Sequence, residues 1–364
     1  MRILFLTPYP TEGPSSRYRI EQYIPYLESR GIKCCVRPFI SSACYKVLYK
    51  KGFYFKKGFY FIVGTLKRFF DLIIAIRNDI IFIHLEAYPF GPPIFESFLT
   101  VFKKKIIYDL DDAIYMKRKS FSNMFLNYLK WPSKVKEIIR VSKYVVTCNE
   151  YLADYANKFN KNVAVIHTAL DTDRFTPKDK AGNSELIIGW MGSHSTAIYL
   201  EELNNVFREL SKRYKFTLKI IGAGRGIIEL PNINVTNLDW FLKDEVEQLQ
   251  SFDIGIYPLP KDEWVLGKTG FKTIQYMSVG IPAVVSDIGA NRIIVKDGVN
   301  GFLVQTQDEW VQKLANLIED SALRKRVGLA ARQTIEEKYS LKLTAPRILK
   351  IIQEVYNENN KGKF

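Results

Sequence analysis

The chain has 364 residues, of which 47% are hydrophobic and 25% are charged. This balance is typical of a folded globular protein and excludes a disordered or fibrous one, and the length suits two domains that each bury a core. The formal net charge of +15 favours anionic partners, namely phosphorylated small molecules, anionic lipid headgroups or nucleic acid.

The sequence shows neither a metal-binding pattern nor a membrane span. Its four cysteines form no C-x-x-C pair and its three histidines are scattered, so we expect no metal site built from them. The first residues, MRILFLTPYP, are typical of a β-strand rather than of a signal peptide. The best span candidate, Phe59–Ile76, is interrupted by Lys67, Arg68 and Asp71. We therefore expect a cytoplasmic protein.

Short apolar runs alternate with helical patterns along nearly the whole chain, which predicts α/β layering with parallel strands. The expected strands of the first half are Arg2–Thr7, Lys33–Phe39, Ile80–His84, Lys105–Asp109, Tyr144–Cys148 and Val163–Ile166. The expected helices between them include Arg17–Arg30 and Val135–Val141.

A second series of elements follows the polar stretch Thr176–Ser184. Its expected strands are Leu186–Trp190, Phe216–Gly222, Ile254–Tyr257 and Ala283–Ser286. Its expected helices are Tyr199–Lys212, Asp244–Gln250, Phe271–Val279, Asp308–Ile318, Ser321–Tyr339 and Leu341–Tyr356. The first expected sheet ends and the second begins near residue 175, which predicts two Rossmann-like domains with a cleft between them. Ligands are expected in that cleft, at the carboxyl ends of the strands.

The hexapeptide KKGFYF occurs twice in succession, at Lys50–Phe55 and Lys56–Phe61. Lysines beside aromatic rings are typical of a membrane interface, where the rings lie at headgroup depth and the lysines meet anionic lipid. The repeat therefore predicts an anionic membrane surface as a partner. The residues expected to contact it are Lys50, Lys51, Phe53, Lys56, Lys57 and Phe59. The alternative is a basic hairpin or helix that packs its rings internally.

The loop PTEGPSSR follows the first expected strand and leads into a helix. Gly13 and the hydroxyls of Ser15 and Ser16 could approach a phosphate closely, and Arg17 and Arg19 could pair with an anion. The pattern is not G-x-G-x-x-G, so it gives little support to a nicotinamide dinucleotide. The alternative is an ordinary turn and helix cap.

Three carboxylates, Asp109, Asp111 and Asp112, cluster where an expected strand ends in IIYDLDDAIY. Carboxylates this close together are costly unless they bind hydroxyls, hold a metal or face water, so at least one is expected to be functional. Coordination of Mg²⁺ or Mn²⁺ and simple helix capping are the alternatives. Glu86, in IHLEAYPFGPP, follows another strand end and is either a further functional carboxylate or a surface charge.

Two loops of the second half carry candidate ligand-binding groups. In GWMGSHST, Gly192 and Ser193 could bring backbone N–H groups against a diphosphate, with His194 as a further donor. In FDIGIYPLPKDEW, Trp264 could stack on a sugar or base, or simply close the core.

The segment GKTGFKTIQYMSVGIPAVVSD predicts a glycine-bracketed loop, a short helix and a buried strand. Free N–H groups at the helix start, together with Lys268 and Lys272, suit a phosphate. Gln275 lies on the same helix face as Lys272 and can offer an amide to a sugar or ribose hydroxyl. The alternative is a helix–strand unit of any α/β protein with two solvated lysines.

These motifs, in this order, resemble the retaining GT-B glycosyltransferases of family 4, the glycosyl transferases group 1, and within them a bacterial surface-polysaccharide subgroup. The resemblance covers nearly the whole chain and rests on DDAIY, LEAYPFGPP and WVLGKTGFKTIQYMSVGIP. It implies an α/β fold of two Rossmann-like domains with parallel sheets facing a cleft. Residues 1–172, completed by a C-terminal helix within 341–364 that crosses back, would bind the acceptor, and residues 173–340 would bind the nucleotide-sugar donor.

The resemblance also implies site residues. Gln275 and Gly267 fall where the family has two glutamates that contact the donor. We therefore expect the backbone of the loop Gly267–Gly270 and the nearby lysines to bind the donor instead. The expected donor-binding residues are Gly13, Ser16, Arg17, Gly192, Ser193, His194, Trp264, Lys268, Thr269, Gly270, Phe271, Lys272 and Gln275. The family's catalytic-site histidine would align with Asp111. Asp111 is therefore expected to activate the acceptor or bind sugar, with Asp109, Asp112 and Glu86 as further catalytic candidates.

The implied activity is transfer of a sugar from a nucleotide-diphosphate sugar to a glycan or lipid-linked acceptor. The setting would be bacterial cell-surface polysaccharide biosynthesis, at the inner face of the cytoplasmic membrane. No cofactor, no bound metal and no nucleic-acid partner are expected, and retention is expected to proceed through a short-lived oxocarbenium pair. Two alternatives stay open: a nucleotide-sugar epimerase on the same fold, and a non-catalytic basic scaffold that binds membrane or nucleic acid.

Overall fold

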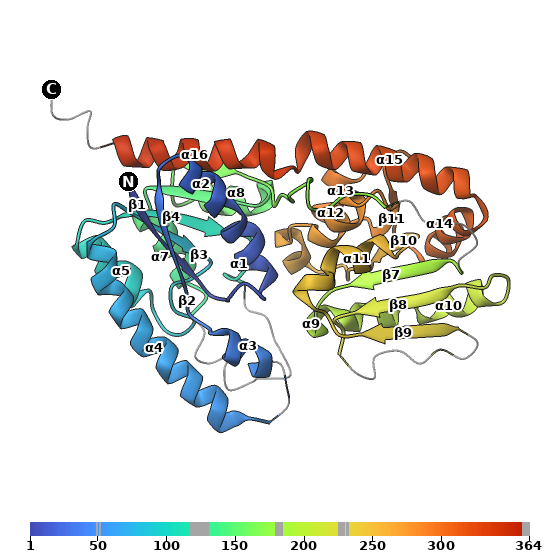
Figure 1. The fold of residues 1–364 in the computed structure, drawn as a ribbon, viewed down its shortest axis with the longest axis horizontal. Coiled ribbons are helices and arrows are strands. Elements are labelled where there is room, and N and C mark those ends of the chain that lie inside the picture. The colour runs from blue at the N-terminus through green and yellow to red at the C-terminus, as the bar shows by residue number, and fades with distance from the viewer. Residues whose placement is uncertain are drawn as a thin grey trace. The chain divides into compact units, whose positions relative to one another are not determined.

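A computed structural model of the protein describes residues 1–48, 50, 52–116, 131–178, 185–224, 230 and 233–358. Lys51 and part of the polar stretch Thr176–Ser184 lie outside the described residues. The chain divides into two compact units (Figure 1). The first comprises Met1–Ala169, Gly267–Thr269 and Leu341–Phe364, and the second comprises Leu170–Leu266 and Gly270–Ser340.

The first unit is built on a six-stranded parallel sheet in the order β2-β1-β3-β4-β5-β6. Its strands are β1 (Arg2–Thr7), β2 (Lys33–Pro38), β3 (Ile80–His84), β4 (Lys105–Leu110), β5 (Tyr144–Thr147) and β6 (Val163–Val165). β3 is buried along its whole length, as expected of a central parallel strand. Because neighbouring parallel strands end at the same edge, this order brings the carboxyl ends of β1, β3 and β4 together.

The helices of the first unit are α1 (Pro14–Arg19), η1 (Glu21–Tyr23), α2 (Ile24–Ser29), α3 (Ser42–Leu48), α4 (Tyr54–Ile76), α5 (Ile94–Val101), α7 (Lys134–Val141), α8 (Glu150–Asn157) and α16 (Leu341–Asn357). α16, at the end of the chain, packs Ile348, Ile352 and Val355 into the same core as Ile3 and Phe82. It lies beside α2 and contacts β3 and β4 (Figure 1).

The second unit contains another six-stranded parallel sheet, in the order β12-β11-β10-β7-β8-β9. Its strands are β7 (Ile187–Met191), β8 (Thr217–Ile221), β9 (Asn234–Leu238), β10 (Ile254–Tyr257), β11 (Ala283–Ser286) and β12 (Phe302–Val304). Its helical segments are α9 (His194–Ala197), η2 (Ile198–Leu203), α10 (Asn204–Ser211), η3 (Leu242–Asp244), α11 (Glu245–Gln250), η4 (Glu263–Gly267), α12 (Phe271–Ser278), α13 (Asn291–Ile294), α14 (Gln307–Glu319) and α15 (Ser321–Lys338).

Tyr276 fixes α12 on the second sheet. Its hydroxyl accepts a hydrogen bond from the Met191 amide at 3.1 Å and donates one to the Ile256 carbonyl at 3.2 Å. Its ring lies directly over Gly255, where a Cβ would come within 2.4 Å of the ring. The glycine therefore allows the ring to approach the strand, and the hydroxyl ties the helix to β7 and β10.

The predicted fold class is confirmed, because both halves of the chain are α/β units with parallel sheets. The differences are local. The expected helix Arg17–Arg30 is broken into α1, η1 and α2, since Pro25 has no N–H to continue it. The short strands β9 and β12 were not expected, because β9 has the polar sequence NVTNL and β12 has only three residues.

The two copies of KKGFYF adopt different structures. The first copy ends at the start of α4 and includes Phe53 in the left-handed region, with φ of 58°. The second copy is helical, and its Tyr60 and Phe61 pack with Phe39 in a small core. Phe53 and Phe59 are exposed. Internal packing thus accounts for some of the rings, and the contact of the repeat with a membrane stays a prediction.

Candidate active site

Hydrogen bonds join the carboxyl ends of β3 and β4 to the first turn of α1. His84, the last residue of β3, lies opposite Asp109 of β4 in the sheet register. Its Nδ1 is 2.7 Å from Oδ2 of Asp109, and its Nε2 is 2.5 Å from the hydroxyl oxygen of Ser15. Ser15 in turn donates to Oδ2 of Asp111 at 3.0 Å. The four side chains thus form one continuous network.

Ser15 links His84 to Asp111 in this network. It has one hydroxyl hydrogen and donates it to Oδ2 of Asp111. The ring nitrogens of His84 face Ser15 on one side and Asp109 on the other, and the direction of these two contacts follows from the tautomer of the ring.

Asp109 is the buried anion that holds this network together. Arg19 on α1 donates two hydrogen bonds to its carboxylate, one of them from Nε at 3.2 Å. Burial alone would raise the pKa of Asp109, but the charge of Arg19 and the hydrogen bond from His84 hold that pKa below its ordinary value. Because Asp109 is only 1% exposed, we regard it as a positioning residue that does not touch substrate.

Asp111 presents an unused acceptor. Its side chain is 9% exposed, and its Oδ1 is buried without a hydrogen-bond partner. A buried carboxylate oxygen that lacks a donor is costly. Nε2 of His84 lies 3.9 Å from this oxygen, beyond hydrogen-bond distance. A hydrogen-bond donor of a bound ligand would supply the missing hydrogen bond.

The other two predicted carboxylates have local partners. Oδ1 of Asp112 accepts a hydrogen bond from the Ala113 amide at 2.9 Å. Glu86 lies 2.6 Å from Nζ of Lys134, a buried lysine that also donates to the Tyr88 carbonyl at 2.6 Å. Glu86 therefore pairs with a buried cation, and its catalytic part stays a prediction.

The predicted donor-binding residues of the first unit shape the loop after β1. A Cβ on Gly13 would come within 2.4 Å of the Tyr9 side chain, so only glycine fits there. The hydroxyl of buried Ser16 accepts from the Tyr9 amide at 3.3 Å, and Arg17 donates to the Thr11 carbonyl at 2.7 Å. The structure therefore gives Ser16 and Arg17 contacts within the loop, and their contact with a donor stays a prediction.

Residues Gly267–Thr269 belong to the first unit. The carbonyl of Lys268 accepts a hydrogen bond from the Asn149 side chain at 3.0 Å. A Cβ on Gly267 would come within 2.6 Å of the Cβ of Ala113. A side chain as large as glutamate does not fit at this position, which gives a physical reason for the glycine found there.

In the second unit, Lys272 lies across Gly192 at the end of β7. Its Nζ is 4.8 Å from the centre of the Tyr257 ring and 5.4 Å from that of Trp190. It also lies 3.5 Å from the hydroxyl of Thr196. A Cβ on Gly192 would come within 2.5 Å of the lysine side chain. The glycine thus makes room for the ammonium group, and the two rings hold it through cation–π contacts.

The N-terminus of α12 lies one residue before Lys272. Gly270 precedes the helix with φ of +67°, a conformation that favours glycine, and no side chain caps the helix start. The start of a helix carries partial positive charge, so the start of α12 at Phe271 and Lys272 is suited to an anion. The structure therefore brings together predicted residues Gly192, Gly270, Phe271 and Lys272.

Gln275 has a hydrogen-bond partner within the second unit. It is buried, and its amide nitrogen donates one hydrogen to Oε1 of Glu245 at 3.3 Å. Glu245 is buried as well and lies 3.5 Å from Arg174. The amide nitrogen of Gln275 is thereby occupied within the protein, and its contact with a ribose hydroxyl stays a prediction.

The remaining predicted residues of the second unit, Ser193, His194 and Trp264, lie at the starts of two short helical segments, α9 and η4. Ser193 and His194 are exposed at the start of α9, and the hydroxyls of Ser193 and Ser195 are 3.0 Å apart. Trp264 is half-buried, and its amide donates to Asp262 at 3.0 Å. Within the described parts of the chain, no three histidine, cysteine, aspartate or glutamate side chains gather in a way that could hold a metal ion.

Two site residues, His84 and Glu245, were not predicted from the sequence. His84 is the last residue of an expected strand, which is a position where functional residues gather in α/β folds. Its partner could be identified only from the strand order, which pairs β3 with β4. Glu245 is one of two acidic residues in α11, and nothing in its local sequence indicates burial.

Residues 185–320 match the family described as glycosyl transferases group 1. Among curated proteins, the capsular polysaccharide biosynthesis glycosyltransferase CapM of Staphylococcus aureus is 23% identical over 209 residues, which are 53% of this chain and 53% of CapM. The chain thus matches about half the length of this relative.

Two solved structures share the fold over nearly the whole chain. A glycosyltransferase from Rickettsia africae has a TM-score of 0.70 and 17% identity, and the match covers 97% of this chain and 98% of that one. HepE from Anabaena, solved in complex with UDP and glucose, has a TM-score of 0.69 and 14% identity, with 97% and 100% covered. The chain therefore has the GT-B fold of these glycosyltransferases, and its residues 185–320 resemble the glycosyl transferases group 1 family.

Proposed function

We propose that the protein is a retaining glycosyltransferase that moves a sugar from a nucleotide-diphosphate sugar to a glycan or lipid-linked acceptor in bacterial cell-surface polysaccharide biosynthesis. The observation that carries the proposal is Lys272, held over Gly192 beside the uncapped start of α12 within the group 1 domain. The name of CapM and the UDP and glucose bound to HepE support the pathway and the donor class.

The second unit binds the donor in this proposal. The diphosphate accepts hydrogen bonds from the first N–H groups of α12 and pairs with Nζ of Lys272. Both contacts strengthen as negative charge builds on the leaving diphosphate. They therefore stabilise the transition state more than the bound substrate, which lowers the activation barrier. The exposed residues Ser193 and His194 are further phosphate contacts in the proposal.

The first unit binds the acceptor through Asp111. The bond between the sugar's anomeric carbon and the phosphate oxygen breaks, and the acceptor oxygen bonds to the same carbon on the same face. The acceptor's hydroxyl proton passes to an oxygen of the departing diphosphate. Oδ1 of Asp111 accepts a hydrogen bond from a sugar hydroxyl, and Ser15, His84, Asp109 and Arg19 hold it in place.

Replacing Lys272 by alanine should weaken binding of the nucleotide sugar by about 10- to 100-fold, because a charge-assisted hydrogen bond is lost. A thermal-shift screen of UDP-, GDP- and ADP-sugars would identify the donor, and calorimetric titration would give the affinities. Lys313→Ala is the matched control, since Lys313 also lies over an aromatic ring of the second unit, 5.1 Å from the centre of Phe302. A protein that no nucleotide sugar stabilises, or an unchanged affinity in Lys272→Ala, would contradict the proposal.

Removal of divalent ions should leave the transfer rate unchanged. In the proposal, Lys272 and the N-terminus of α12 supply the positive charge that a metal ion provides in other phosphate-transfer sites. The measurement is the rate of sugar transfer after dialysis against EDTA, with and without added Mg²⁺ or Mn²⁺. A rate that falls with EDTA and returns with either ion would show that the reaction needs a metal.

A further inference from the structure

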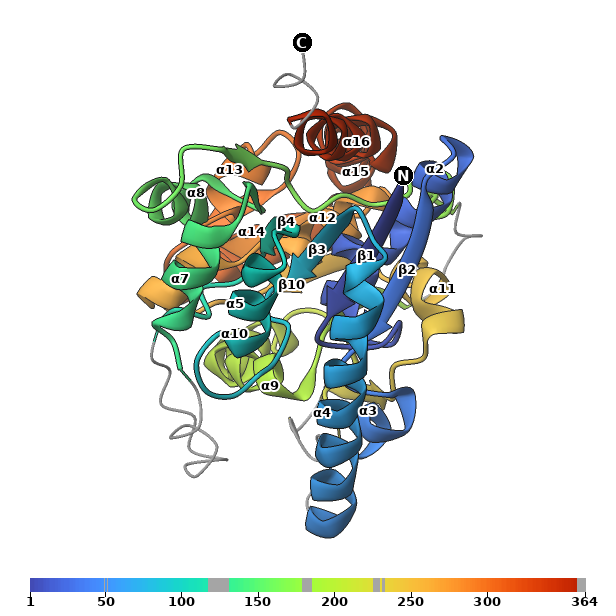
Figure 2. The ribbon, with the colours of Figure 1, turned by 90° about the vertical axis from the view of Figure 1, so that its left-hand side faces the viewer.

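The outward face of α4 is an apolar stripe. Its members recur every three or four residues, which is one side of a helix, and each is between 49% and 65% exposed. The six residues are Phe59, Ile62, Leu66, Phe69, Ile73 and Ile76. Phe55, which extends the stripe by one more turn, is 96% exposed. Figures 1 and 2 show the N-terminal part of α4 extending beyond the sheet of the first unit.

The inward face of α4 carries the polar groups that solvent-facing helix surfaces normally have. Arg68 and Asp71 are both buried and lie 3.1 Å apart, and Asp71 also accepts from Arg37 at 2.6 Å. Arg68 donates further to the carbonyls of Thr7 and Arg37, each at 3.1 Å. α4 therefore turns this charged pair inward, while the apolar side chains of the stripe face outward. An apolar stripe of this length marks an interaction surface.

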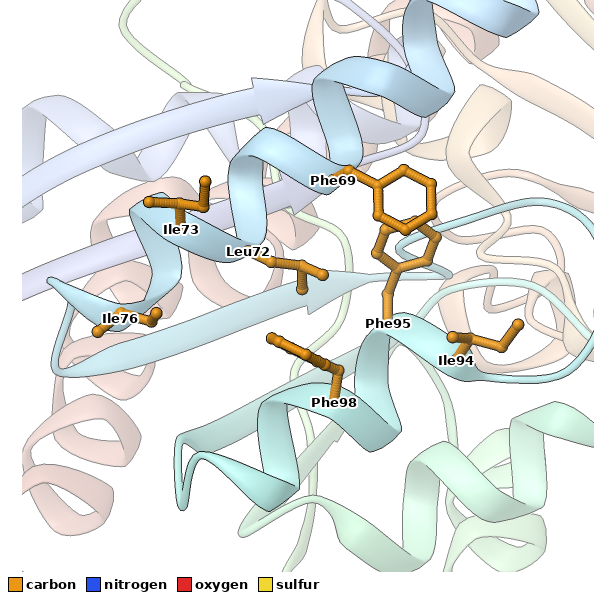
Figure 3. A pocket seen from close by; sticks show the side chains of 7 residues that line it. All are labelled: Phe69, Leu72, Ile73, Ile76, Ile94, Phe95 and Phe98. Carbon is orange, nitrogen blue, oxygen red and sulfur yellow. The ribbon is translucent and has the colours of Figure 1, made fainter.

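α5 extends this surface beside the C-terminal half of α4. Phe69, Leu72, Ile73 and Ile76 of α4 and Ile94, Phe95 and Phe98 of α5 line an apolar groove of about 290 Å³. Figure 3 shows the side chains of the two helices converging on it. Val101, on the outward face of α5, is exposed as well. We call the stripe and this groove together the apolar surface.

The charges on these two helices indicate what covers the apolar surface. Asp71 and Glu96 are the only acidic residues of α4 and α5, and both are buried. Arg68 is the buried cation of α4. The other cationic residues within α4 and directly after α5 are at least partly exposed, and they are Lys56, Lys57, Lys67, Lys103 and Lys104. The apolar surface is thus bordered by positive charge and exposes no carboxylate from either helix. This combination matches an anionic lipid surface, where apolar groups meet acyl chains and lysines meet headgroups.

We propose that the apolar surface docks onto an anionic phospholipid bilayer, with α4 lying in the plane of the interface. No helix among the described residues is long and apolar enough to cross a bilayer, which suits a helix that lies on it. The inference rests on the proposed function in one respect, because docking of this kind serves an acceptor held in a membrane. It goes beyond the KKGFYF repeat, which contributes only the first turns of the stripe.

Vesicle binding by the full-length protein tests the inference. The protein should co-sediment with vesicles of phosphatidylcholine mixed with phosphatidylglycerol, and more weakly with pure phosphatidylcholine. The double variant Ile62→Gln/Leu66→Gln should bind at least about tenfold more weakly, because two exposed side chains no longer enter the acyl region. The matched control is Ile293→Gln/Leu329→Gln, the same chemical change at side chains of similar exposure (56% and 63%) in the second unit, and it should bind like the unmodified protein.

A second variant separates the contribution of charge. Lys56→Gln/Lys57→Gln/Lys67→Gln should lose about fivefold in anionic-vesicle binding for each lysine, and raised salt should have the same effect on the unmodified protein. Binding that is equal on neutral and anionic vesicles would overturn the assignment to an anionic surface. So would a dimer, seen by light scattering without vesicles, that the Ile62→Gln/Leu66→Gln variant converts to monomer, because the surface would then belong to a second copy of the chain.

Donor binding measured on the same samples distinguishes the two proposals. If the protein binds a nucleotide sugar but no vesicle, docking is wrong and the proposed function stands. If it binds anionic vesicles through the apolar surface but no nucleotide sugar, docking stands and the proposed function is wrong. Because Ile62 and Leu66 are exposed, their replacement should leave the melting temperature and the donor affinity unchanged.

Discussion

Asp111→Asn should lower the kcat of sugar transfer by about 100-fold, the loss expected when a bound reactant is misplaced by about 1 Å. The carboxylate has one oxygen bonded to Ser15 and one without a partner, and the amide cannot present two acceptors in the same places. Donor affinity should change little, because the proposed donor contacts lie in the second unit. The measurements are steady-state transfer kinetics and calorimetric donor binding.

Two further variants make this test specific. Asp154→Asn on α8 removes an exposed carboxylate of the same unit and should leave kcat unchanged. Ser15→Ala removes the hydroxyl that orients Asp111 and should give a smaller loss in kcat than Asp111→Asn. If Asp111→Asn transfers sugar at nearly the unmodified rate, Asp111 does not contact the reacting sugars and the site must be placed elsewhere.

Asp109→Asn should reduce the free energy of unfolding by about 3–5 kcal/mol, the cost of removing one partner from a buried ion pair. Arg19 is 2% exposed and would keep its charge without the carboxylate, and His84 would lose the acceptor for its Nδ1 hydrogen. Denaturant unfolding at neutral pH measures the loss. Asp287→Asn is the control, because its partner Arg292 is 59% exposed, and such a pair contributes about 1 kcal/mol or less.

The buried ion pair of Arg19 and Asp109 makes the free energy of unfolding depend on pH in the acid range. Because the pKa of Asp109 in the folded protein lies below its ordinary value of 3.8, the pair contributes its full stability above that pH. The contribution disappears as pH falls through the lowered pKa and the carboxylate takes up a proton. Asp109→Asn should therefore remove part of the acid-dependent loss of stability. An unfolding free energy with the same acid dependence in both proteins would mean that Asp109 is not held ionised by Arg19.

The two positions at which the sequence departs from the resemblance, Gly267 and Gln275, each contact a residue far away along the chain. Gly267 lies against Ala113, where a Cβ would approach within 2.6 Å, so no glutamate fits at this position. Gln275 donates its amide hydrogen to Glu245, a carboxylate supplied from another helix. Neither contact has a signal in the local sequence, because both partners are far away along the chain.

The sequence by itself was enough to predict the twin α/β units, most strands and the loop–helix segment around Lys272. These features depend on local patterns: apolar runs, glycines at turns and the spacing of charges along one helix. The order of the motifs was also sufficient to indicate glycosyltransferase relatives, and the match at residues 185–320 agrees with that.

Only the tertiary structure decided which side chains meet and which faces stay open. His84 and Asp109 become partners because β3 pairs with β4, and strand order is not encoded in the pattern of either strand. Lys272 reaches Tyr257 and Trp190 because Gly192 leaves room for it. The apolar periodicity of α4 shows that one face avoids water, but the fold buries Arg68 and Asp71 instead and leaves that face exposed. The periodicity of apolar residues indicates which side chains favour burial, whereas tertiary packing determines which of them are buried.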